Sequence, residues 1–287
     1  MKLSIITINY NNAEGLKKTL GSVAAQTCTS FEHIIVDGAS TDGSVDIIRE
    51  YENQLHITHS TIHLLWSSEK DNGIYDAMNR GIRKAKGEYT LMLNSGDYLV
   101  DERVIERIMP ELDGTDIVQG NNIEECSGKT YRNRGYGKSD IDFFDVMKGH
   151  FLHQSSFCKR DLFERYGYFD ESYRISGDTK FFLNCLGAHN ATFKYVDIDV
   201  DNYDCSGISA SQSGEWYEQG VKENARLRDE LFSKRMQKHF EENDKKIRLY
   251  DVLHKHKWIW NLTMAVAHIY RLFYGEYPKD YKREAIK

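Results

Sequence analysis

Hydrophobic and polar positions along the first hundred residues alternate in blocks, and these blocks predict strands separated by helices. Apolar runs rich in β-branched residues occupy four segments, at residues 3–9, 31–37, 62–66 and 89–93. Apolar residues recur at helical spacing in three intervening segments, at residues 13–26, 44–51 and 71–86. Because strands alternate with helices, the pattern predicts a mainly parallel sheet with right-handed crossover connections.

The pattern of the remaining chain is less regular. It predicts strands at 117–120, near 131, at 149–157 and at 192–198, and helices at 101–109, 160–166 and 175–186. From residue 214 onward the pattern is helical. We therefore expect an α/β domain over residues 1–210, with a mixed, mainly parallel sheet flanked by helices, and a helical C-terminal extension over residues 211–287.

Charge is distributed unevenly between the two ends of the chain. The whole chain carries a formal net charge of −6, whereas residues 221–287 carry +6, which leaves −12 on residues 1–220. An acidic body argues against nucleic acid as a partner.

The five cysteines are odd in number, widely spaced and without a C-x-x-C pair, which favours a reducing compartment over a disulfide framework. Since no signal-peptide pattern is visible, we expect a cytoplasmic protein.

The most informative polar cluster, Asn94-Ser-Gly-Asp97, follows the predicted strand at 89–93. In an open α/β sheet, ligands bind beyond the carboxyl ends of the strands. A carboxylate there can hold a divalent cation, and the cation can hold a phosphate. The same residue types also form turns, so the cluster alone leaves a plain turn open.

Two other predicted strands end in similar polar clusters. Thr7, Asn9 and Asn11 lie at the end of the first strand, and Asp37 ends the second. Such groups suit a nucleotide pocket, although a residue such as Asn12 is also a typical helix cap. The repetition of this arrangement at successive strand ends favours a ligand site.

A third cluster lies within residues 69–81. Asp76 and Asn79 share one face of a predicted helix, which an amphipathic surface helix would also explain. Gly73 and Gly81 cost helix stability, so their presence indicates that other backbone or a ligand approaches closely.

Taken together, these segments resemble the family 2 inverting glycosyltransferases of the GT-A fold. The resemblance is carried by residues 4–11, 36–43, 71–81 and 93–97, and it continues in residues 153–157 and 173–181. Each motif is weak alone, but the ordered set with this spacing is specific. The resemblance implies a nucleotide-binding half at residues 1–100 and an acceptor-binding half at residues 101–210.

The resemblance also implies a role for each matching position. Thr7, Asn9 and Asn11 would line the nucleotide pocket, and Asp37 would contact the base. The base and diphosphate would be bordered by Asp71, Gly73, Asp76 and Asn79. UDP is the expected nucleotide of the sugar donor on the ground of the resemblance alone.

Asp97 ends the segment that matches the family's metal motif, which implies a bound Mg²⁺ or Mn²⁺ ion. One carboxylate remains where the family usually has several, so affinity for the ion should be modest.

Asp178 matches the position of the family's catalytic base, although an Asp at a helix start is usually a cap. As the base it would take a proton from the acceptor hydroxyl while that oxygen attacks the anomeric carbon, with inversion.

The acceptor side is less specified by the sequence. Contacts to the acceptor or the sugar are expected from Asn94, Ser95, His153 and Gln154. Candidate platforms for sugar stacking are Trp66, Tyr173 and Trp216. A lone histidine is more often structural, and most aromatic residues belong to the core. The resemblance implies a saccharide or lipid-linked saccharide acceptor, in surface polysaccharide or glycolipid synthesis.

The segment at 258–274 is apolar and aromatic, and basic residues flank it on both sides. Through residues 255–283 it would lie in the interface of a membrane, at the inner face. Burial against the body, or against a second copy in a homo-oligomer, explains the same pattern and stays open.

Two other functions stay open as well. A nucleotidyltransferase has a similar α/β layout, but the loop at 9–15 has one glycine and no arginine with which to grip a triphosphate. A non-catalytic nucleotide-sugar-binding protein would keep the pocket without an effective metal site.

Overall fold

The computed structural model describes residues 1–126, 128–148, 151–205, 207 and 213–255. Contacts group the chain into two compact units, Met1–Phe232 and Ser233–Lys287. The first unit contains the sheet, and the second contains the helix α9 (Lys234–Lys255). The predicted boundary at residue 210 stays a prediction.

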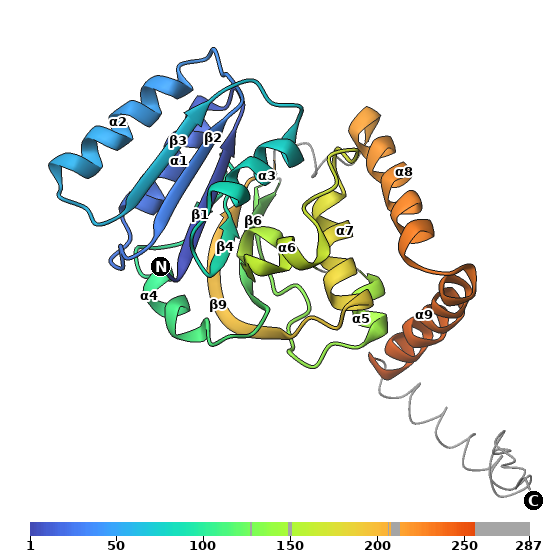
Figure 1. Cartoon of the computed structure of the whole chain (residues 1–287). Coiled ribbons are helices and arrows are strands. Elements are labelled where there is room, and N and C mark those ends of the chain that lie inside the picture. The colour runs from blue at the N-terminus through green and yellow to red at the C-terminus, as the bar shows by residue number, and fades with distance from the viewer. Residues whose placement is uncertain (127, 149–150, 206, 208–212, 256–287) are drawn as a thin grey trace, which may run out of the picture. The chain divides into compact units, whose positions relative to one another are not determined.

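The first half of the sheet is built from parallel strands. These are β1 (Leu3–Asn9), β2 (Glu32–Asp37), β3 (His63–Ser68) and β4 (Tyr89–Met92). They lie in the order β3-β2-β1-β4, and each neighbouring pair is parallel (Figure 1). Their carboxyl ends therefore meet at one edge of the sheet, as the alternating pattern predicted.

Helices cover both faces of these strands. They are α1 (Ala13–Ala24), α2 (Ser44–Ile57) and α3 (Ile74–Lys84). Ile5 of β1 packs in one core cluster with Leu16 of α1 and Ile48 of α2. The next residue, Ile6, points to the other face, because successive side chains of a strand alternate. There it lies so close to Gly81 of α3 that a Cβ atom at that position would collide with it.

The second half adds strands of mixed direction. These are β5 (Tyr98–Leu99), β6 (Ile117–Cys126), β7 (Lys129–Asn133), β8 (Ser156–Lys159) and β9 (Phe193–Tyr203). Within the described residues the full sheet has nine strands in the order β3-β2-β1-β4-β8-β6-β9-β5, with β7 paired to β6. β8 is antiparallel to both β4 and β6, whereas β9 runs parallel to β6. The expected mixed, mainly parallel sheet flanked by helices is thus confirmed.

Short helices connect these strands. They are α4 (Val104–Ile108), α5 (Phe143–Lys148), α6 (Asp161–Tyr166) and α7 (Gly177–Leu183), whereas the longer α8 (Gly214–Leu231) follows the last strand, β9. Short 3-10 helices lie at Met109–Glu111 and His153–Ser155, and a π-helical turn lies at Asn184–Ala188.

The predicted strand at 149–157 is wrong for residues 153–155, which form a 3-10 turn. The Ser155 N–H and the Ser156 hydroxyl both donate to the carbonyl of Leu152, and these bonds close the turn. β8 starts only at Ser156. Local side-chain hydrogen bonds have here displaced the strand that the apolar pattern favoured.

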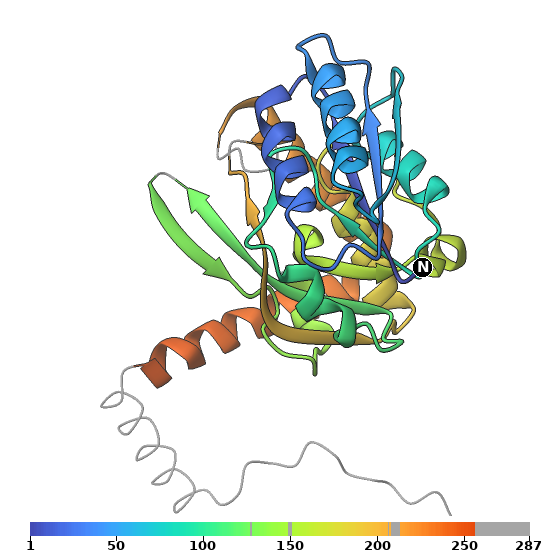
Figure 2. The ribbon, with the colours of Figure 1, turned by 90° about the vertical axis from the view of Figure 1, so that its left-hand side faces the viewer.

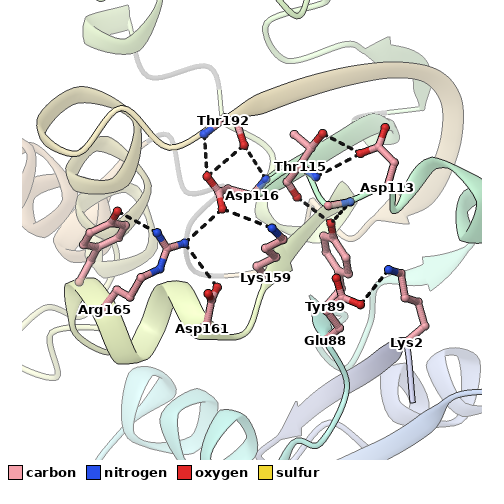
Figure 3. Close-up of polar contacts among 12 residues, drawn as sticks. Lys2, Glu88, Tyr89, Asp113, Thr115, Asp116, Lys159, Asp161, Arg165 and Thr192 are labelled. Atoms are coloured by element: carbon pink, nitrogen blue, oxygen red, sulfur yellow. Dashed lines mark hydrogen bonds and ion pairs between the residues drawn. The ribbon is translucent and has the colours of Figure 1, made fainter.

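Asp116 holds together the strand ends that lie farthest from the carboxyl ends of β1 and β4. Its carboxylate accepts from the N–H and hydroxyl of Thr192, and it pairs with Lys159 and Arg165 (Figure 3). Asp116 precedes β6, Thr192 precedes β9, and Lys159 ends the antiparallel β8. This network fixes one end of the second half and leaves the opposite end for a site.

The structure pairs Cys126 with Cys205 as a disulfide, which the cysteine spacing did not predict. Glu124 of β6 lies opposite Tyr203 of β9 in a parallel register, so the residues two positions further on also face each other. The β6–β7 hairpin, which begins with this strand, extends to the side in Figure 2. Register between distant strands, which the sequence does not reveal, brings the two thiols together.

No helix in the described part of the chain is long and apolar enough to cross a membrane. The basic, aromatic segment that was predicted to contact a membrane lies outside the described residues, except for Lys255 at the end of α9.

Candidate active site

A cavity of about 1090 Å³ opens at the carboxyl ends of β1, β2 and β4. Eleven of the predicted site residues line it: Asn9, Asn11, Asp71, Gly73, Asp76, Asn94, Ser95, Asp97, His153, Gln154 and Asp178. Segments from both halves of the sheet therefore converge on one hollow, where the crevice of an open α/β sheet is expected.

Three predicted residues, Thr7, Asp37 and Asn79, lie behind the cavity wall. Thr7 Oγ1 hydrogen-bonds His33 Nε2 at 3.0 Å inside the sheet. Asn79 joins α3 to Phe169, accepting from its N–H and donating to its carbonyl. These side chains stabilise the structure beneath the wall, and their predicted contacts with a nucleotide stay predictions.

Asp37 anchors the loop after β2 from beneath. Its buried carboxylate accepts from Asn9 Nδ2, from the Ser40 N–H and hydroxyl, and from the Ser68 hydroxyl. Burial alone would raise the pKa of Asp37, but these hydrogen bonds outweigh it and lower the pKa. The structure thus assigns Asp37 four donors of its own chain, where the sequence predicted a contact with a base.

The loop after β1 joins the loop after β4. Asn12 caps α1, as predicted, by accepting from the Gly15 N–H, and its amide donates to the carbonyl of Ser95 at 3.0 Å. Asn11 accepts from the Thr41 N–H at 2.8 Å. These cross-loop bonds hold the strand-end loops in fixed positions around the cavity.

The start of α3 supplies a second part of the wall. Asp71 accepts from the Gly73 N–H at 3.0 Å, and Gly73 has a φ of +125°, which favours glycine. A Cβ atom at Gly38 would lie 2.6 Å from Asp71 Oδ2, so the loops after β2 and β3 touch. Asp76 is held by an ion pair with Arg80 at 2.8 Å.

Asp97 lies in the inner corner, with 5 % of its surface exposed. Its carboxylate accepts from the N–H of Asp204 at 2.9 Å, and burial raises the pKa of Asp97 to about 7. A Cβ atom at Gly96 would lie 2.7 Å from Asp204 Oδ2, so a second carboxylate flanks the corner. The sequence pattern missed Asp204, because only folding brings the end of β9 beside β4.

The described residues contain no group of three or more His, Cys, Asp or Glu side chains placed to hold a metal ion. One buried carboxylate with a second beside it still fits a divalent cation that takes its other oxygen ligands from phosphate and water. Asp97 is therefore the residue that would hold such an ion.

Asp178, in the first turn of α7, has hydrogen-bond partners at both carboxylate oxygens. The Tyr75 hydroxyl donates to Oδ1 at 2.9 Å, and His153 Nδ1 lies 2.8 Å from Oδ2. Burial raises the pKa of Asp178, but the hydrogen bond and charge of His153 outweigh it and lower the pKa. Asp178 is consequently an ionised, oriented carboxylate that can accept a proton at neutral pH.

The same contact changes the picture of His153. Burial alone would lower the pKa of His153, but Asp178, Asp97 and Asp201 raise it overall. The sequence predicted that His153 contacts an acceptor; in the structure its ring also orients Asp178.

Aromatic and basic residues complete the outer part of the cavity. Of the three predicted stacking platforms, Tyr173 and Trp216 line it, whereas Trp66 packs against the core. Lys70 and Arg174 also line the cavity and add positive charge. Sequence reasoning had not singled out these two cations, since isolated surface charges carry no pattern.

Comparison with known proteins identifies the family of the chain. The family model described as glycosyl transferase family 2 matches residues 4–175, which is more than half of the chain. The chain belongs to glycosyl transferase family 2. The predicted resemblance is thereby confirmed, and the strand-end motifs that carried it lie within the matched residues.

Curated relatives within this family are glycosyltransferases. The chain is 32 % identical over 203 residues to a PGL/p-HBAD biosynthesis glycosyltransferase of Mycobacterium bovis, covering 70 % of this chain and 75 % of the relative. It is 30 % identical over 149 residues to the glycosyltransferase AglE of Haloferax volcanii, covering 51 % and 46 %.

Solved structures share the fold of the chain. Residues 1–349 of TarS from S. aureus in complex with UDP-GlcNAc align with a TM-score of 0.61 at 20 % identity, covering 79 % of this chain and 66 % of that one. The mannosyltransferase PcManGT from Pyrobaculum calidifontis, in complex with GDP-Man and Mn²⁺, aligns with a TM-score of 0.55 at 19 % identity, covering 77 % and 61 %. The chain thus spans less than two thirds of both solved chains.

Proposed function

We propose that this family 2 glycosyltransferase moves a hexose from a nucleotide-diphospho-sugar, with a UDP-sugar as the favoured donor, to an acceptor hydroxyl with inversion. The observation that carries the proposal is the position of Asp178, an ionised carboxylate on the same cavity as the strand-end residues. In this proposal residues 1–100 bind the donor and residues 101–210 bind the acceptor.

The donor fits the part of the cavity formed by the first half. Asn9, Asn11 and Asp71 offer hydrogen-bonding groups to a nucleoside, and Tyr10, with 67 % of its surface exposed, offers a ring on which a base can stack. Lys70 supplies a positive charge for the diphosphate. Binding of UDP-GlcNAc by TarS and of GDP-Man by PcManGT supports a nucleotide-sugar donor.

A divalent cation, Mg²⁺ or Mn²⁺, would be held by Asp97. When bound, it would neutralise charge that grows on the departing nucleoside diphosphate. The Mn²⁺ in the PcManGT complex supports this cofactor. Arg174, which lines the same cavity, adds to the positive potential around the leaving group.

Asp178 would act as the general base. It takes the proton from the acceptor hydroxyl while that oxygen forms the bond to the anomeric carbon, and the bond from that carbon to the diphosphate oxygen breaks. Tyr75 and His153 hold the two carboxylate oxygens, which fixes the direction of proton transfer. One displacement at the anomeric carbon inverts its configuration.

The proposed acceptor is a saccharide or lipid-linked saccharide in surface polysaccharide or glycolipid synthesis, at the cytoplasmic face of the membrane. The biosynthetic name of the mycobacterial relative supports a role in synthesis of a larger product. Trp216, with 41 % of its surface exposed, offers an aromatic face to a sugar on the acceptor side, whereas the ring of Tyr173 is buried and lies against Lys180 and Arg226.

A donor screen with an NMR readout tests the proposed function. The full chain is incubated with Mn²⁺ and each of several UDP-sugars, with GDP-mannose as the alternative, and the anomer first released into water is recorded. We expect an α-linked UDP-sugar to release the β-anomer first, and chelation of the metal to slow release about 100-fold. Release of the α-anomer first would contradict inversion.

Two other outcomes would replace the proposal. UDP binding without turnover of any donor would support a non-catalytic binding protein. Release of pyrophosphate from a nucleoside triphosphate and a sugar phosphate would support a nucleotidyltransferase.

A further inference from the structure

Glu223 is a buried carboxylate on α8, with 4 % of its surface exposed. It accepts hydrogen bonds from three consecutive backbone N–H groups, those of Arg174 at 2.8 Å, Ile175 at 2.9 Å and Ser176 at 2.9 Å. The amide of Gln219 donates to the same carboxylate at 2.8 Å. This segment, residues 174–176, lies directly before the turn that carries the proposed base.

A side chain of α3 holds the same segment from another direction. The single hydrogen of the Tyr75 hydroxyl is shared between the carbonyl of Ile175, at 2.6 Å, and Asp178, at 2.9 Å. A Cβ atom at Gly177 would lie within 2.9 Å of three atoms of the Tyr75 ring, so the backbone passes close against it. The polar groups of residues 174–176 are thus bound by Glu223 and Tyr75 together.

The face of α8 that carries Glu223 also reaches the cavity. Trp216 lies two helical turns before Glu223 and lines the cavity, and Leu227 lies one turn after it and is buried. Between them, Gly220 lies against the side chain of Ile175. An apolar residue would serve for packing alone, since burying a carboxylate is costly unless it is hydrogen-bonded. What the carboxylate adds to packing is its hydrogen bonds with the three N–H groups of residues 174–176.

We propose that Glu223 is a positioning residue for the transfer reaction, which holds residues 174–176 so that Asp178, in the turn that follows, faces the reacting hydroxyl. The inference rests on the proposed function, because it assigns a role in the geometry of that reaction. It makes α8 a part of the catalytic site. A shift of the base by about 1 Å is enough to slow such a reaction severely.

The test compares Glu223→Gln with Glu218→Gln, a matched change at an exposed position of the same helix. UDP release from a UDP-sugar in water, UDP affinity with Mn²⁺ by calorimetry, and the thermal midpoint are measured on the full chain. We expect the maximal release rate of Glu223→Gln to fall about tenfold or more. UDP affinity should stay within about twofold, and Glu218→Gln should match the wild type.

A second variant, Gln219→Ala, loosens Glu223 without removing its charge, and we expect a fall in release of about two- to fivefold. If Glu223→Gln does not fold, the release rate of Gln219→Ala tests the role of Glu223 instead. An unchanged release rate in the folded variants, or a parallel loss of release and UDP affinity, would overturn the role of Glu223. Failure of the wild type to release UDP from any nucleotide sugar would overturn the proposed function itself, and this role with it.

Discussion

The two halves of the catalytic unit are built on different principles. In residues 1–100, parallel strands alternate with helices, and each ligand-facing loop follows the strand that positions it. In the chain after residue 101, strands run in both directions, and the proposed base depends on partners far away in sequence. Tyr75 reaches Asp178 across 103 residues, and Glu223 reaches Ile175 across 48.

This difference separates two parts of the cavity by the way in which their residues are positioned. Loops at the ends of neighbouring strands form one part of the cavity, which follows directly from the sheet. Asp178, in contrast, is held in place by side chains of α3, the turn before β8 and α8, through Tyr75, His153 and Glu223. Substitutions at these contacts separate an effect on the stability of the fold from an effect on the rate of the reaction.

The largest effect on stability is expected where α3 of the first half joins the second half. Asn79→Ala removes the partner of both backbone groups of Phe169, which stay buried, so the free energy of unfolding should fall by about 2 to 3 kcal/mol. Urea unfolding measures this, with Asn53→Ala on the exposed side of α2 as the control. UDP affinity of the folded variant should be unchanged, because Asn79 lies behind the cavity wall. A loss of UDP affinity without a loss of stability would instead support the predicted contact between Asn79 and the nucleotide.

A pH-dependent loss of stability is expected within the first half. Burial lowers the pKa of His33 to about 3, from 6.5 when unfolded. The stability contributed by neutral His33 is therefore complete above pH 6.5 and is lost as pH falls towards 3. Between pH 6.5 and 5 the loss is about 2 kcal/mol.

Urea unfolding of His33→Gln and of the wild type across this range isolates the effect. The variant should lack this part of the pH dependence, and His63→Gln at an exposed position should keep it. Equal slopes for all three proteins would show that His33 is not held neutral in the sheet.

A smaller effect, on chemistry alone, is expected from Tyr75→Phe. The change removes the hydroxyl that donates to Asp178 and to the Ile175 carbonyl but keeps the ring, so the maximal rate of UDP release should fall about tenfold. Steady-state kinetics measure it, with Tyr168→Phe, whose hydroxyl bonds the exposed Glu164, as the control. A raised KM at an unchanged maximal rate would instead place Tyr75 in donor binding.

The fold of the first half followed from local patterns. β1 was predicted with its observed bounds, because a short apolar run flanked by polar clusters and helical segments has few alternatives. The polar motifs of this half indicated eight of the residues that line the cavity. The ligand contacts of Asp37 and Asn79 stay predictions, since a polar residue in a motif does not reveal which of its partners belong to its own chain.

The second half could be predicted only in part. The turn at His153–Ser155 and the disulfide of Cys126 with Cys205 depend on hydrogen bonds and register between distant strands. Asp204 and Glu223 had no local signal, because their partners lie more than 45 residues away. The sequence thus indicated Asp178 as the base, which stays a prediction, and the structure adds the contacts that orient this carboxylate.

The most direct test of this account is the UDP affinity and UDP release rate of Asp178→Asn, measured side by side with Asp161→Asn at an exposed position. We expect Asp178→Asn to bind UDP within about twofold of the wild type while its release rate falls by about 10²- to 10⁴-fold. Full release activity in Asp178→Asn, or a loss of UDP binding equal to the loss of release, would contradict the assignment of donor binding and proton transfer to separate halves.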